Sequence, residues 1–119
     1  MAGKERDVSK PTAPVSSPRK PSAALQRAQD FLQGRGGVRQ NCEQALSYLR
    51  VAAQANEPAA AVQMGSLYAT GHCVQRDPVM AYRWFNSAHE LEPENAEIQA
   101  NIDHLWGRMT AQERRQAGH

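Results

Sequence analysis

Two segments of this chain repeat one pattern, and the repetition restricts the possible folds more than any other feature. Residues 21–34 align with residues 58–71 at an offset of 37, which becomes 36 after the glycine-containing turn. The positions that then agree are Val38, Asn41, Ala45, Tyr48, Leu49 and Ala52 with Val74, Asp77, Ala81, Trp84, Phe85 and Ala88. This period is typical of helical solenoids, in which each unit buries its apolar face against its neighbours. Solenoids usually bind proteins and seldom catalyse reactions.

The charge of the chain is unevenly distributed. Residues 1–20 hold five basic and two acidic side chains, a net charge of +3, whereas the other 99 residues hold nine basic and ten acidic ones, a net charge of −1. At 119 residues the chain is long enough for one small domain. A nearly neutral domain without a stripe of Lys or Arg argues against a nucleic-acid partner, because phosphate neutralisation supplies most of that affinity.

The cysteines and the hydropathy pattern bear on cofactors and on the compartment. Cys42 and Cys73 lack partners at the CxxC spacing of a zinc site, so we predict no metal and no other cofactor, while a disulfide between the two stays open. No run of about 18 apolar residues predicts a membrane-spanning helix, and the N-terminal segment lacks the apolar stretch of a secretory signal. We therefore expect a cytoplasmic protein unless a signal or anchor has been removed, with membrane association only through an assembly.

We predict that residues 1–20 form a disordered tail, because their prolines break helices and few of their side chains are apolar. The rest of the chain has a helical pattern. Pro21 and Pro58 stand where a first helical turn tolerates proline. Gly34 and Gly71 stand where a left-handed residue closes a helix.

The second helix of each copy is marked by an N-cap residue, Asn41 or Asp77. Apolar residues then recur at helical spacing, namely Ala45, Tyr48, Leu49 and Ala52, and Ala81, Trp84, Phe85 and Ala88. A fifth helix opened by Pro93 and Glu94 is expected to cap the stack, because an open solenoid end leaves apolar surface in water. The predicted divisions are a tail 1–20, repeats 21–56 and 57–92, a capping helix 93–114 that is a partial third repeat, and a disordered end 115–119.

The second copy carries a spaced motif of eleven residues, Ala60, Met64, Gly65, Tyr68, Gly71, Val74, Asp77, Ala81, Trp84, Phe85 and Ala88. This motif resembles the Sel-one-like repeat, a subfamily of the tetratricopeptide-like repeats. In the second copy one position departs from it, Cys73, where glycine is usual. In the first copy Arg27 stands where leucine is usual, which suits a first helix with no outer neighbour. The resemblance covers about residues 21–113. It implies an all-α, right-handed solenoid of two antiparallel helix pairs plus a C-terminal capping helix, with first helices on the concave side.

Tetratricopeptide-like proteins commonly bind peptides or partner helices along that concave face. The resemblance implies three rows across it, Leu25, Val62 and Ile98, then Gln29, Ser66 and Ile102, then Leu32, Ala69 and Leu105, with Gln33, Thr70 and Trp106 at the edge. If exposed, these rows would form an apolar patch that binds a partner. Two alternatives stay open: the capping helix covers the rows and makes them core, or two copies associate weakly through them.

Candidates for catalysis are few. His72 and Cys73 are adjacent in the second interhelical turn, and Cys42 begins a helix whose dipole favours a thiolate. Nucleophilic catalysis also needs a base, an orienting group and an oxyanion site in one pocket, which a short solenoid does not offer. We interpret Cys73 as a small residue in a glycine-type turn position, and His89 and His104 as solvated. No catalytic residue is predicted.

These features predict a non-catalytic scaffold or adaptor that binds a partner protein or peptide. The family resemblance alone adds that such modules often serve signalling complexes or envelope-associated machinery in bacteria. The main alternative is a regulatory module that its basic tail tethers to a larger assembly or an anionic membrane surface. A thiol-based redox enzyme or sensor is a further alternative, and it requires an unusually reactive Cys42 or Cys73.

Overall fold

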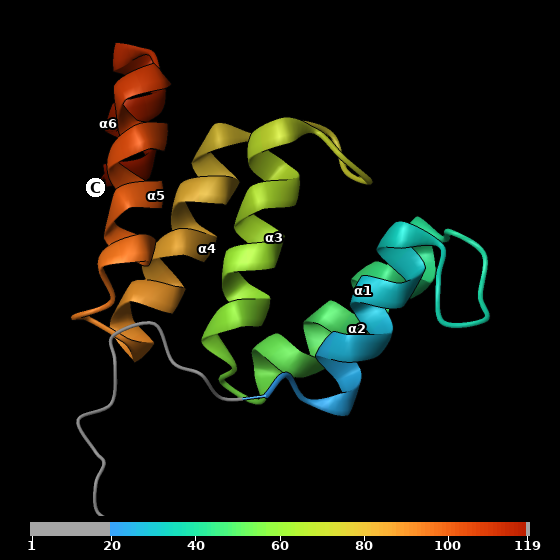
Figure 1. The fold of residues 1–119 in the computed structure, drawn as a ribbon. Helices are drawn as coiled ribbons and strands as arrows, with labels where there is room; N and C mark the ends of the chain where they lie inside the picture. The colour runs from blue at the N-terminus through green and yellow to red at the C-terminus, as the bar shows by residue number, and fades with distance from the viewer. Residues whose placement is uncertain (1–19, 119) are drawn as a thin grey trace, which may run out of the picture.

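A computed structural model describes residues 20–118, and every regular element in that range is an α-helix. The helices are α1 (Ala23–Gln33), α2 (Cys42–Gln54), α3 (Pro58–Thr70), α4 (Pro78–Leu91), α5 (Ala96–Arg108) and α6 (Ala111–Gly118). α1 packs on α2, α2 on α3, α3 on α4, and α4 on both α5 and α6 (Figure 1). The chain is therefore an all-α protein with the architecture of a short solenoid, as predicted. The predicted tail, except Lys20, falls outside the described residues.

Glycine and N-cap residues end and begin the helices where the sequence predicts. Gly34 and Gly71 adopt left-handed backbone angles, with φ of 70° and 78°, and each donates its N–H to the carbonyl four residues earlier. The side chains of Asn41 and Asp77 each accept a hydrogen bond from the amide three residues later. These four residues set the two interhelical turns.

The prediction for the first prolines is right for Pro58 and wrong for Pro21. Pro58 is the first residue of α3. α1 instead begins after Ser22, whose hydroxyl oxygen accepts a hydrogen bond from the N–H of Leu25 at 3.1 Å, so Pro21 precedes the helix. The serine side chain satisfies a free amide of the first turn, whereas a proline in the cap position has no side-chain acceptor for that amide.

The C-terminal region differs from the predicted single helix over 93–114 and disordered end over 115–119. α5 ends at Arg108 and a further helix, α6, runs to Gly118. Thr110 and Glu113 form a capping box at the start of α6. The Thr110 hydroxyl accepts a hydrogen bond from the N–H of Glu113 at 3.1 Å, and the Glu113 carboxylate accepts one from the N–H of Thr110 at 2.9 Å. The last described residues therefore lie in a helix that packs on α4.

The core lies on two sides of α3. One cluster joins α1, α2 and α3 and the other joins α3, α4 and α5. Helix α3 contributes Met64 and Leu67 to the first cluster and Ala61 to the second. The fully buried positions of the second helices include the predicted Ala45, Leu49, Ala52, Ala81, Phe85 and Ala88. Because α3 is packed on both sides, its sequence is apolar around most of its circumference.

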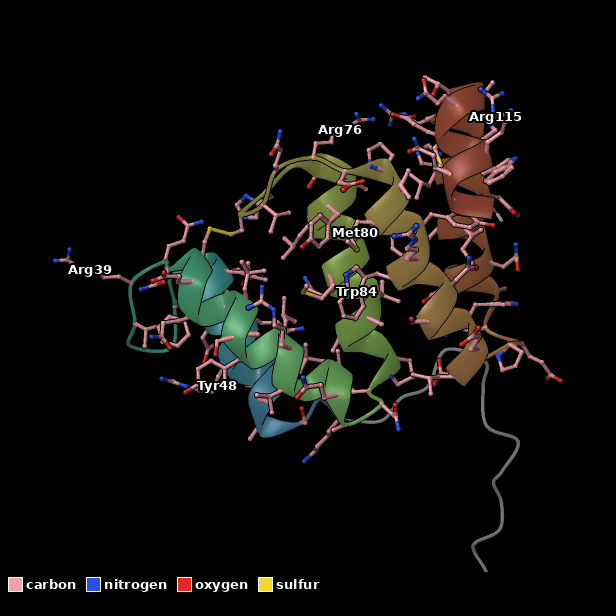
Figure 2. All side chains as sticks on the ribbon, turned by 180° about the vertical axis from the view of Figure 1, so that it is seen from behind. Arg39, Tyr48, Arg76, Met80, Trp84 and Arg115 are labelled. Carbon is pink, nitrogen blue, oxygen red and sulfur yellow. A yellow bond between two sulfur atoms is a disulfide. The ribbon has the colours of Figure 1, made fainter. Side chains whose placement is uncertain are left out.

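A disulfide joins Cys42 at the start of α2 to Cys73 in the turn between α3 and α4, with 5.2 Å between the Cα atoms (Figure 2). It ties the first repeat to the second. Sequence alone left this pairing open and interpreted Cys73 only as a turn residue. That interpretation of its backbone is confirmed, because Cys73 has a φ of 68°.

Candidate functional site

Helices α1, α3 and α5 share one face of the molecule, the face seen in Figure 1. Near the N-terminal ends of these helices lies a hollow of about 390 Å³, which we call the first hollow. Leu25, Val62 and Ile98, one residue from each helix, line it together with Gln29. The first of the three predicted rows therefore does come together in space.

A second hollow of about 210 Å³ lies two helical turns further along the same face. Four residues of the predicted rows and edge line it, namely Ser66, Ala69, Thr70 and Leu105. Asn101 of α5 lines both hollows, so they are neighbours along α3 and α5. We call the whole surface the α1–α3–α5 groove.

The predicted partner-binding residues differ in how much surface they offer. The chain's own core buries five of them, Leu25, Leu32, Ile98, Ile102 and Leu105. Five more are half-buried, namely Gln29, Val62, Ser66, Ala69 and Trp106. The remaining two, Gln33 and Thr70, are exposed. The rows are thus shared between the core and the groove, and a partner would meet mainly their half-buried and exposed members.

The sequence predicts Trp106 at the edge of the groove, but this residue lies elsewhere. Its ring packs against Tyr82 of α4 at 5.2 Å between centroids, and the guanidinium of Arg114 lies 5.5 Å from the ring centroid. Arg114 also donates from Nε to the carbonyl of Trp106 at 2.9 Å. Helix α6, which the sequence interpretation did not include, supplies this cover.

Sequence reasoning missed the charged residues around the groove. The first hollow includes Lys20, Glu57, Glu92 and Glu97, and the second includes Arg76, His104 and Arg108. Most of them stand at helix ends, where a repeat motif defined by apolar positions carries no information. Arg108 follows the predicted Leu105 by three residues, so the helical period is the signal that could have found it.

Glu57 holds two of the groove helices together. Its carboxylate accepts hydrogen bonds from the backbone N–H of Ser22, at 3.0 Å, and from the Ser22 hydroxyl. The same hydroxyl oxygen caps α1 by accepting from Leu25 N–H. The start of α3 is thereby joined to the start of α1, on the rim of the first hollow.

The disulfide bears on the alternative of a thiol-based enzyme or sensor. Cys42 and Cys73 are paired, so neither offers a thiol as nucleophile or redox sensor in this state. His72 is exposed in a turn and His89 is half-buried on α4, while His104 lines the second hollow. Within residues 20–118, no group of three or more His, Cys, Asp or Glu side chains is placed to hold a metal. Nor is any helix of this range long and apolar enough to cross a membrane.

Stacked helix pairs with a groove across their first helices define the class of short α-helical repeat proteins. The Sel1 repeat model matches residues 21–57 and 58–91, and the chain belongs to the Sel1 repeat family. Domains of this family are typically protein-interaction modules and are generally non-catalytic. The two matched units correspond to α1 with α2 and to α3 with α4.

A solved structure shares this fold. The chain is similar to c5321, a protective antigen present in uropathogenic Escherichia coli strains that displays an SLR fold, with 32% identity and a TM-score of 0.73. The match covers 83% of this chain and 21% of the antigen, so the chain spans about a fifth of that protein's length. Comparison with curated protein sequences gave no match.

Proposed function

We propose that this protein is a non-catalytic adaptor that binds a segment of a partner protein in the α1–α3–α5 groove. The observation that carries the proposal is a pair of neighbouring hollows that share Asn101 as a lining residue: α1, α3 and α5 line the first hollow, and α3 and α5 also line the second. Concave, mostly apolar surfaces with a few polar groups are the usual ligand sites of proteins. Membership of the Sel1 repeat family supports the same function.

The disulfide bears on where the adaptor works. Disulfides persist in secreted, periplasmic and other oxidising compartments, and they are rare in the cytosol. The Cys42–Cys73 bridge therefore favours an oxidising compartment over the cytoplasm that the sequence predicted by default. A bacterial envelope or an extracellular space fits this chemistry.

A peptide-display experiment tests the proposed function. A library of random peptides is selected on the full, oxidised chain, and the selected peptides are then measured against an Ala59→Arg variant. Ala59 is exposed and lines the first hollow, so the arginine fills the groove and removes little core packing. We expect the variant to lose most of the affinity for the selected peptides.

The matched control is the same substitution at Ala111, which is exposed at the start of α6 and lines neither hollow. The Ala111→Arg variant should bind the peptides as the parent does. Circular dichroism shows whether both variants keep their helices. Selected peptides that bind the two variants equally well would place the binding surface outside the groove and overturn the proposal.

A further inference from the structure

The two hollows of the α1–α3–α5 groove carry opposite charge. The first is lined by three carboxylates and a single ammonium group, those of Glu57, Glu92, Glu97 and Lys20. The second is lined by two guanidinium groups and an imidazole, those of Arg76, Arg108 and His104, and by no carboxylate of the described residues. The sign of the charge therefore changes along the groove.

The contacts of the carboxylates leave their charge in place. Glu57 accepts a hydrogen bond from the backbone N–H of Ser22 at 3.0 Å, and Glu92 accepts one from the side-chain amide of Asn95 at 2.9 Å. Both donors are neutral. Glu97 is exposed to solvent. The first hollow thus keeps an excess of negative charge, which favours a cationic group of a ligand.

The helices also set the distance between the hollows. On α3, Val62 lines the first hollow and Ala69 the second; on α5, Ile98 and Leu105 do the same. Each pair is seven residues apart, which is two helical turns or about 10 Å. An extended chain rises about 3.3 Å per residue, so it covers this distance in about three residues.

We propose that the groove binds an extended segment of a partner protein that carries Lys or Arg in the first hollow and Asp or Glu about three residues away in the second. Apolar side chains of the segment lie against Val62 of the first hollow and Ala69 of the second. The inference rests on the proposed function of the groove and adds the chemistry of its partner. Opposite charges at the two ends disfavour segments with one sign of charge, because such a segment places a like charge in one hollow.

The peptides selected on the full chain provide the first test. Those that the Ala59→Arg variant fails to bind should contain the opposite-charge pair at this spacing. We expect a change of either charged residue to the opposite sign to weaken binding about two- to tenfold, as for exposed ion pairs that turn repulsive. The difference should shrink at 1 M salt, where charges are screened beyond about 3 Å.

Charge-reversal variants of the protein provide the second test. Glu97 and Arg108 are exposed on α5, and each lines one hollow. Glu97→Lys should weaken binding of a selected peptide and should prefer the version of that peptide in which Lys is replaced by Glu. Arg108→Glu should show the reciprocal preference, for the version in which Glu is replaced by Lys.

The controls separate charge from folding. Glu97→Gln removes the charge without reversing it and should give a smaller loss than Glu97→Lys. Arg50→Glu changes an exposed residue of α2 that lines neither hollow, and it should leave all affinities unchanged. Thermal unfolding by circular dichroism verifies that each variant is folded.

The outcomes distinguish this inference from the proposed function. Peptides that need the groove but lack the charge pair, or that bind both charge-reversal variants as they bind the parent, would overturn the inference alone. Failure to select any groove-dependent peptide would overturn both. A dimer that dissociates in the Glu97→Lys variant, measured by analytical ultracentrifugation, would assign the groove to a second copy of this chain and would also overturn the inference.

Discussion

Gly65 of α3 and Phe85 of α4 are in close contact within the second helix pair. A Cβ atom on Gly65 would lie 2.5 Å from Cε1 of the Phe85 ring, which is too short for real carbon contacts. The equivalent positions of the first pair hold Ala28 and Leu49, both completely buried. In each repeat a smaller residue on the first helix packs against a larger one on the second helix. The first repeat combines alanine with leucine, and the second combines glycine with phenylalanine.

This pairing predicts that the effect of Gly65→Ala changes sign with its neighbour. In the parent chain the new methyl group overpacks the buried Phe85, at a cost of about 1–3 kcal/mol that exceeds the gain of about 1 kcal/mol in helix propensity. A Phe85→Leu background contains the Ala and Leu combination that the first repeat buries at Ala28 and Leu49, so Gly65→Ala should there stabilise the protein by up to about 1 kcal/mol. Urea unfolding of the four proteins of this double-mutant cycle measures the coupling.

Gly107 supplies the control for this cycle. It lies on α5, and a Cβ atom added to it would meet no heavy atom within 4 Å, so Gly107→Ala gains helix propensity without a clash. We expect about 0.5–1 kcal/mol of stabilisation in either background. Additive behaviour of Gly65→Ala and Phe85→Leu would contradict the volume argument.

Individual residues could be predicted from the sequence where one local rule decides the conformation. Gly71 closes α3 and Asp77 caps α4 because backbone geometry alone selects those residue types. Ser22 was missed because the adjacent Pro21 satisfies a competing rule for the first turn. The hydrogen bonds of Glu57 join residues 35 positions apart, and no local pattern encodes such contacts.

At the scale of elements, α6 depends on its capping box because none of its residues is buried. Thr110→Ala removes the side-chain acceptor for the N–H of Glu113. We expect a cost of about 1 kcal/mol, which would raise hydrogen exchange of the α6 amides about fivefold while the amides of α3 keep their protection. Tryptophan fluorescence should report the change as well, since α6 covers Trp106.

Thr70→Ala tests whether this effect comes from the cap. The Thr70 hydroxyl donates to the carbonyl of Ser66 within α3 and caps no helix. The Thr70→Ala variant should therefore leave the hydrogen exchange of the α6 amides unchanged. Equal exchange of α6 in the Thr110→Ala variant and the parent would show that the helix is held by its contacts with α4 instead.

The first four helices could be predicted because their pattern occurs twice, once in α1 and α2 and again in α3 and α4. Two aligned copies reinforce one another, so the apolar positions of α2 and α4 emerge together. The end of α5 and the whole of α6 have no second copy of this kind. Apolar residues through Met109 suggested one continuous helix, and the sequence Thr110-Ala111-Gln112-Glu113 contains the capping box that should have indicated the break.

At the scale of the whole molecule, the groove could be predicted only in part. The repeat motif places Leu25, Val62 and Ile98 in one row, and the structure brings them together around the first hollow. The motif does not say how much of each side chain the neighbouring helix covers, because that depends on how the repeats pack. It also carries no charge information, so apart from Arg108, which the helical period could have found, the acidic and basic residues of the groove emerge from the assembled fold.

The disulfide acts on the whole molecule, since it connects the first repeat to the second. Cys42 and Cys73 are 31 positions apart in the sequence, and closing a loop of this size stabilises a protein by about 3–4 kcal/mol in the chain-entropy description. We expect reduction to lower the free energy of unfolding by about this amount. Urea unfolding of the oxidised and the reduced protein measures it.

The replacement for Cys73 matters in the matched variant. Its φ of 68° lies in the left-handed region, where a residue with a Cβ is strained by about 1–2 kcal/mol and glycine is not. Cys42→Ala combined with Cys73→Gly should therefore be more stable than Cys42→Ala combined with Cys73→Ala, and neither should respond to a reductant. An unfolding midpoint of the parent that reductant leaves unchanged would mean that the contacts of α2 with α3 alone hold the repeats together.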